Sequence, residues 1–325
     1  MARINKTLST IIRVVVSVGL ISFLVYRNAD NLRTMLMEAR ELDIFFLSAA
    51  VVSYFLAISG GVFRWDILLK AQDIHIRKPF LHQSILIGFF YNNILPTTVG
   101  GDAYRVYDLA KNKDVGAPKT SSTVVLERFV GILTGLIYLL ASFAFGMHAI
   151  LSLNMVISLL AFIAAMVMVI IILINPYFFR LDRLFERFRL LKRIKPKLSA
   201  FRGIILSYRN RKKQFFICCL YSFIMQFFFI LAYWAVSTSM GLAIRLPAFV
   251  FMVQVVSIVA NIPITVGGIG VRENALAFLL VALGTTRSQA ALFSFIILFI
   301  ILFNAMLGGL VYIAKNLFYR SKGVI

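Results

Sequence analysis

Two stretches of the sequence repeat the same group of residues. Residues 96–105 read PTTVGGDAYR and residues 263–272 read PITVGGIGVR, so six of the ten positions are identical. A proline followed by a Gly-Gly pair ends a helix and permits backbone dihedrals that other residues avoid. The helix that begins after it offers free N–H groups and a positive dipole end. Each copy adds an arginine, Arg105 or Arg272. This combination is suited to binding an anion such as phosphate.

Further charged residues lie inside apolar runs. Glu127 and Arg128 are adjacent in one run, and Glu273 directly follows Arg272. An unpaired charge at the centre of a membrane helix costs about 2.5 to 3.5 kcal/mol on the insertion scale. We therefore expect these charges to face a shared polar interior, with local Arg–Glu pairing as the alternative. In a shared interior, Glu127 and Glu273 are candidates for proton or ion coupling.

These residues define a predicted site for the headgroup or phosphate of a substrate. Pro96 and Pro263 would break the two apolar regions, and Asn92, Asn93 and Asn261 would add polar contacts near the breaks. The alternative is a pair of tight turns whose arginines extend to the membrane surface. The predicted binding residues are Arg105, Arg128, Arg272, Gly100, Gly101, Gly267, Gly268, Thr98 and Thr265.

Other site classes have little support. The only cysteines, Cys218 and Cys219, are adjacent, and the three histidines are scattered, so neither a disulfide framework nor a metal site is predicted. No GxxxxGK[ST] phosphate loop occurs, which argues against direct ATP use. No cofactor and no catalytic residue are predicted.

Composition indicates a polytopic membrane protein. Hydrophobic residues make up 61% of the 325 residues and charged residues only 14%, which is too apolar for a soluble chain of this length. The net charge of +21 lies largely in loops, so we expect no nucleic-acid partner. The first apolar run is predicted to be a retained signal anchor.

Six apolar runs approach the length of about 20 residues that a transmembrane helix needs. The segment 175–213 holds thirteen Lys or Arg residues and is predicted to be a cytoplasmic loop on the anionic leaflet. Both termini are then cytoplasmic and the segment 27–43 lies outside. The six runs are 9–26, 44–63, 119–146, 152–174, 214–236 and 288–314.

Two remaining apolar regions, 80–112 and 248–285, each contain one copy of the repeated motif. Orientation of the flanking runs requires each region to enter and leave on one side, from opposite faces of the membrane. The sequence thus predicts an all-α polytopic fold with six transmembrane helices and two re-entrant helical hairpins. The halves 1–147 and 148–325 would form an inverted repeat within one membrane domain, as in many secondary transporters.

Three motifs carry a family resemblance: NNILPTTVGGDAYR, VVLERFVG and NIPITVGGIGVREN. They resemble the lysylphosphatidylglycerol synthase transmembrane region family, a flippase-like family that includes the membrane half of multiple-peptide-resistance factors. The resemblance implies a membrane protein that handles anionic or aminoacylated phospholipids, or polyprenyl-linked or hopanoid lipids. Two-part relatives add a soluble domain that transfers lysine from transfer RNA to phosphatidylglycerol. The sequence stops at Ile325, after the last run, so that catalytic domain is expected to be absent.

The sequence therefore favours a lipid translocator of the cell membrane that moves phospholipid or lipid-linked headgroups without direct ATP use. One alternative is a membrane-embedded transferase or accessory subunit for lipid-linked substrates, with Glu127 or Glu273 as a base. A second is a secondary transporter for small anions. The candidate protein partners are a second copy of the chain and a cytosolic or membrane-bound lipid-modifying enzyme.

Overall fold

A computed structural model describes residues 2–95, 99–113, 115–144, 210–262 and 264–321, with isolated positions between 164 and 208. All regular secondary structure in these ranges is helical. Five helices are long and apolar enough to cross a membrane. They are α1 (Ala2–Arg27), α3 (Ile44–Lys70), α6 (Ala117–Ala144), α10 (Lys212–Ser239) and α13 (Arg287–Ser321).

These five helices correspond to five of the six predicted spans. The predicted span 152–174 and most of the predicted basic loop 175–213 lie outside the described residues. Asp43 caps the start of α3, because its side chain accepts hydrogen bonds from the N–H groups of Phe45 and Phe46. The helix begins at Ile44. It continues to Lys70, seven residues beyond the predicted end of its span at residue 63, so Arg64 belongs to the helix.

The segment 27–43 is not an irregular loop. It forms a short 3-10 helix, η1 (Ala29–Asn31), followed by α2 (Leu32–Arg40). Met35 is the buried residue of α2, and Ser288 of α13 donates a hydrogen bond to the carboxylate of Glu38. Because α2 is a charged helix of nine residues with a single buried apolar residue, hydropathy alone does not reveal this helix.

Each copy of the repeated motif joins two short helices. The first copy connects α4 (Lys78–Ile94) to α5 (Gly100–Lys113), and the second connects α11 (Leu246–Ala260) to α12 (Val271–Ala282). The longest of these has 17 residues, or about 26 Å of helix, less than the hydrocarbon core of about 30 Å. None of the four helices can span a bilayer by itself.

Glycines allow close packing within and between these pairs. A Cβ at Gly101 of α5 would lie 1.9 Å from the carbonyl oxygen of Gly88 in α4, so the two helix backbones touch. A Cβ at Gly267, in the second turn, would lie 3.1 Å from the Cα of Asn93. The turn between α11 and α12 therefore packs against the end of α4, although the two segments are far apart in sequence.

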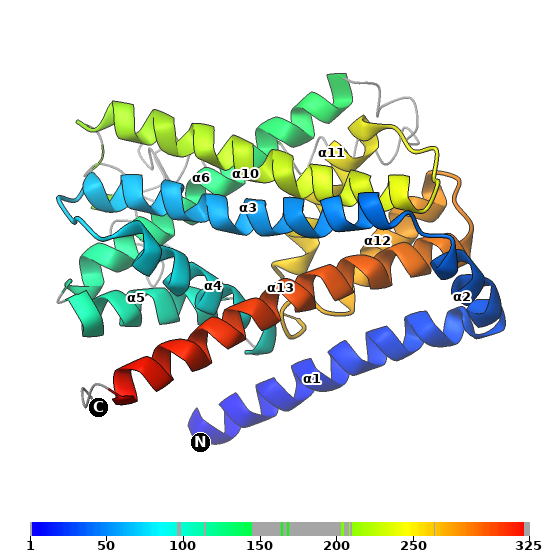
Figure 1. The fold of residues 1–325 in the computed structure, drawn as a ribbon, viewed down its shortest axis with the longest axis horizontal. Coiled ribbons are helices and arrows are strands. Elements are labelled where there is room, and N and C mark those ends of the chain that lie inside the picture. The colour runs from blue at the N-terminus through cyan, green and yellow to red at the C-terminus, as the bar shows by residue number, and fades with distance from the viewer. Residues whose placement is uncertain are drawn as a thin grey trace, which may run out of the picture.

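The long helices pack against these short pairs. The helices α3 and α10 run side by side, and the start of α1 and the end of α13 lie toward the same end of the molecule, the left in Figure 1. Trp65, Phe249 and Phe293 are among the largest fully buried side chains. Many apolar side chains remain exposed on the outside, among them Phe45 and Phe299. Exposed apolar surface of this extent is suited to contact with lipid.

Replacement of Gly101 by alanine should destabilise the protein. The added methyl group would collide with the backbone of α4, and overpacking of this kind costs about 1 to 3 kcal/mol. We expect a lower midpoint of thermal unfolding for the purified protein in detergent. Gly19→Ala is the control, because nothing lies within 4 Å of its added Cβ. An unchanged midpoint in Gly101→Ala would contradict the close α4–α5 contact.

Candidate functional site

Three adjoining cavities lie where the short helix pairs meet α3, α6 and α10. We call them the turn cavity, of about 240 Å³, which Asn93 and Arg272 line; the ion-pair cavity, of about 230 Å³, which Arg105 and Glu127 line; and the amide cavity, of about 480 Å³, which Gln226 and Gln254 line. Arg128 and Phe229 line all three, so the cavities adjoin one another at these two side chains.

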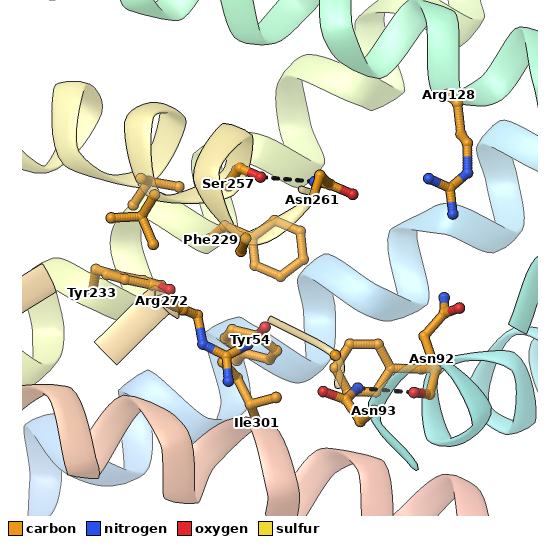
Figure 2. Close-up of a pocket in the computed structure, with 15 residues that line it drawn as sticks. Tyr54, Asn92, Asn93, Arg128, Phe229, Tyr233, Ser257, Asn261, Arg272 and Ile301 are labelled. Atoms are coloured by element: carbon orange, nitrogen blue, oxygen red, sulfur yellow. Dashed lines mark hydrogen bonds between the residues drawn. The ribbon is translucent and has the colours of Figure 1, made fainter. Parts of the chain in front are cut away.

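The turn cavity brings together residues of the second motif copy and residues that lie just before the first copy. Asn92 and Asn93 come from the end of α4, Asn261 follows α11, and Gly267 lies in the second turn. Figure 2 shows Arg128 and Arg272 on different sides of this space, with Tyr54 and Tyr233 as aromatic walls near Arg272. Two cationic and several amide side chains thus converge from three helices and one turn.

Arg272 has hydrogen-bonding capacity left over. Its side chain is buried, and its Nε donates to Glu273 Oε1 at 2.9 Å. Its Nη2 has no hydrogen-bond partner in the described part of the chain. The other oxygen of Glu273 accepts from the Gly270 N–H at 2.5 Å, so Glu273 caps the start of α12 and orients the guanidinium. A buried donor without a partner is costly and suits a ligand that supplies an acceptor.

Glu127 links two arginines inside the protein. Arg64 of α3 donates to Glu127 Oε1 at 2.7 and 3.0 Å, and Arg105 of α5 donates to Oε2 at 2.6 Å. The Arg105 guanidinium also lies 4.0 Å from the ring centre of Trp65, a cation–π contact. Glu127 is 3% exposed. Both oxygens of Glu127 are therefore engaged in holding α3, α5 and α6 together.

A second ion pair joins two of these three helices, α5 and α6. Asp102 of α5 accepts a hydrogen bond from Arg128 Nε of α6 and lies 3.7 Å from Arg105 Nη1. The Arg128 side chain nevertheless keeps 42% of its surface exposed. This pairing holds the Arg128 guanidinium beside Asp102, and the Arg128 side chain lines all three cavities.

The remaining predicted site residues occupy varied positions. Gly100 begins α5, and the Gly101 N–H donates to Asn92 Oδ1 at 2.8 Å. Thr265 is buried and its Oγ1 has no partner, and Gly268 packs against Ala260. Thr265, Gly268 and Glu273 do not line the cavities. Pro96, Thr98 and Pro263 lie outside the described residues.

Sequence reasoning missed several lining residues. Arg64 directly follows the predicted span 44–63, which ends there because a charge normally marks the end of a span; the apolar residues 67–69 were the available signal that the helix continues. Gln226 and Gln254 lie in two largely apolar helices that also carry other polar residues, among them Ser222 and Ser257. Tyr54 and Tyr233 carry no sequence signal that separates them from other membrane tyrosines. Among the described residues no group of three metal-ligating side chains converges.

Comparison with known proteins places this arrangement in a family. The model of the lysylphosphatidylglycerol synthase TM region matches residues 10–309. The chain belongs to this family. It is similar to a UPF0104 membrane protein of Pyrococcus horikoshii, with 26% identity over 79% of this chain and 83% of the relative. A UPF0104 membrane protein of Methanothermobacter thermautotrophicus is 23% identical over 78% of this chain and 80% of its own length.

A third relative, a UPF0104 membrane protein of Methanocaldococcus jannaschii, is 28% identical over 39% of this chain and 38% of its own length. No solved structure gives a significant match. The family match and the five apolar helices together establish a multi-pass membrane protein.

Replacement of Glu127 by glutamine should be strongly destabilising. Removing one partner from a buried ion pair leaves an uncompensated charge and costs about 3 to 5 kcal/mol, and here Arg64 and Arg105 both lose their partner. We expect a large decrease in the denaturant midpoint in detergent. Asp73→Asn is the control, since Asp73 is exposed and lies 3.4 Å from Arg211. Equal midpoints for the two variants would contradict the anchoring role of Glu127.

Proposed function

We propose that this protein is a flippase-like translocator that moves the phosphate-bearing headgroup of an anionic membrane lipid between the two leaflets, without direct ATP use. The observation that carries the proposal is the free donor of buried Arg272 in a cavity lined by the second motif and by the end of α4, just before the first motif. Arg128 borders the same space. Charge-assisted hydrogen bonds from arginine are the strong contacts by which proteins bind phosphate.

The membrane topology forms part of the proposal. The pairs α4–α5 and α11–α12 are proposed to be re-entrant hairpins that enter from opposite faces and meet at their turns. With a sixth span supplied by residues 152–174, the two halves would form an inverted repeat. The close contact of Gly267 with Asn93 and the insufficient length of the four helices support this topology. Non-helical turns at membrane depth require protein or a water-filled cavity around them, which the turn cavity supplies.

Translocation is favoured over group transfer by the state of the two carboxylates. Glu127 binds two arginines, and Glu273 binds Arg272 and the Gly270 N–H. A general base needs a free oxygen within reach of the proton that it removes. Of these two carboxylates, neither has an oxygen without such a contact. The exposed apolar outer surface would let the acyl chains remain in the bilayer while the headgroup crosses the cavities.

Reconstitution tests the proposed function directly. Vesicles of phosphatidylcholine would contain the purified protein and a trace of phosphatidylglycerol labelled on its acyl chain, and an impermeant reductant would report the rate of leaflet exchange. We expect fast exchange for the wild type. Arg272→Gln should lose about 1.5 to 3 kcal/mol of phosphate binding, or roughly 10- to 100-fold in rate.

The matched control is Arg287→Gln, an arginine at the exposed start of α13. Its exchange rate should equal that of the wild type. Equal rates for Arg272→Gln and the wild type would contradict the role of Arg272. A change in the mass of the recovered lipid would instead favour the transferase alternative.

Labelling of single cysteines tests the proposed orientation. In a background with Cys218 and Cys219 replaced by alanine, Glu41→Cys lies between α2 and α3, and His75→Cys lies between α3 and α4; both native positions are exposed. An impermeant maleimide should label the first variant in intact cells and the second only after permeabilisation. Labelling of both variants in intact cells would contradict cytoplasmic termini.

A further inference from the structure

The amide cavity contains an unusual pair of side chains. Gln226 of α10 and Gln254 of α11 both line it, and both adjoin Gly135 of α6. The cavity shares Arg128, Phe229, Ser257 and Asn261 with the turn cavity. A ligand whose phosphate lies between Arg128 and Arg272 can therefore extend its headgroup toward the two amides.

Each of the two amides has one buried atom without a partner. Gln254 is 5% exposed, and its Nε2 makes no hydrogen bond with the described residues. Gln226 donates through Nε2 to the Gly131 carbonyl at 2.9 Å and to Thr134 Oγ1 at 2.8 Å, which fixes its orientation. Its Oε1 has no hydrogen-bond partner among the residues that the structure describes. The cavity thus offers one neutral donor and one neutral acceptor, and buried polar groups normally have partners.

Gly135 leaves space for these side chains. A Cβ at this position would lie 3.0 Å from Gln254 Oε1 and within 4 Å of both polar atoms of the Gln226 amide. Any larger residue at position 135 would press against the amide of Gln254. The absence of a side chain at this point of α6 keeps the wall of the amide cavity open.

We propose that Gln226 and Gln254 form a subsite for a neutral, hydroxyl-bearing headgroup of a phosphodiester lipid. This inference rests on the proposed function of the turn cavity. A hydroxyl group donates one hydrogen bond and accepts others, so it can satisfy both free amide atoms at once. A glycerol or another polyol attached to the phosphate has this chemistry.

The charges of the cavities argue against an aminoacylated headgroup. No aspartate or glutamate lines the turn cavity or the amide cavity, in the part of the chain that the structure describes. Asp102 and Glu127 line the ion-pair cavity, and both are bound by arginines. An ammonium group would therefore enter without a counter-ion, at a cost that burial increases.

The net charge of the arginines and carboxylates at and beside the cavities also matches a ligand with a single negative charge. Arg64, Arg105, Arg128 and Arg272 bring four positive charges to this region, and Asp102, Glu127 and Glu273 bring three negative charges. A phosphodiester carries one negative charge, and a neutral polyol adds none. An aminoacylated phosphatidylglycerol with a lysyl group would instead bring net positive charge to a positive site.

Binding of two matched lipids tests the subsite. The probes are dihexanoyl phosphatidylglycerol and dihexanoyl phosphatidylpropanol, which have the same charge and carbon skeleton and differ by two hydroxyl groups. Native mass spectrometry of the purified full chain would give both affinities. We expect the wild type to prefer the glycerol lipid by roughly tenfold, because an analogue without the hydroxyl leaves buried polar groups unpaired.

Gln254→Met removes the amide with little change in volume. It should lower the affinity for phosphatidylglycerol to that for phosphatidylpropanol. The affinity for phosphatidylpropanol should stay unchanged. Gln214→Met, the same substitution on α10 outside all three cavities, should retain the preference. If Gln254→Met does not fold, Gly135→Ala serves as the second variant and should reduce the same preference.

Equal affinity of the wild type for both lipids would overturn the proposal, as would a preference that persists in a folded Gln254→Met or Gly135→Ala variant. Tighter binding of lysylphosphatidylglycerol than of phosphatidylglycerol would also overturn it. Leaflet exchange without a headgroup preference in binding refutes the subsite alone. A binding preference without leaflet exchange refutes the proposed translocation and leaves the subsite in place.

Discussion

Charged side chains inside an apolar helical protein must find their partners within the protein, because lipid offers none. Glu127 meets this constraint by accepting hydrogen bonds from Arg64 of α3 and Arg105 of α5. In the neighbouring pair the two charges are exchanged between the helices, because Arg128 belongs to α6 and its partner Asp102 to α5. These ionic contacts hold the first short helix pair, α4 and α5, against the long helices α3 and α6. The position of this pair relative to the second turn depends on the same contacts.

This network divides the arginines into two groups. Arg64 and Arg105 are directed at Glu127, and Arg105 is covered further by Trp65. Arg128 and Arg272 are each held by one nearby carboxylate but border the turn cavity. The first group holds the helices together, and the second presents cationic surface where the end of α4 meets the second turn. The free Nη2 of Arg272 is the clearest sign that this surface is suited to a ligand.

Much of the helical arrangement could be predicted from hydropathy and from the repeated motif. Long apolar runs reveal the long helices, and the Pro-Gly-Gly sequences locate the breaks between the short ones. Hydropathy could not place Arg64 correctly, because a charge satisfied by a partner on another helix looks the same in sequence as a charge in a loop. It also could not reveal α2, whose only buried residue is Met35.

The candidate site was predictable in type but not in detail. The repeated motif pointed to Arg105 and Arg272, and the charges inside an apolar run pointed to Arg128. Neither signal could distinguish the arginine that Glu127 binds from those that border the turn cavity. That distinction depends on contacts between residues far apart in sequence. The amide pair Gln226 and Gln254 was missed for the same reason, since two glutamines on separate helices carry no common spacing.

The central claim is that a lipid headgroup occupies the space between the two turns. Photolabelling of the reconstituted protein with a phosphodiester lipid that carries a diazirine on its headgroup tests this claim most directly, with the labelled residues identified by mass spectrometry. The account predicts label on residues 89–95 at the end of α4 and on residues 253–272 of the second pair, reduced by excess unlabelled lipid. Label confined to the exposed faces of α1, α3 and α13 would contradict it.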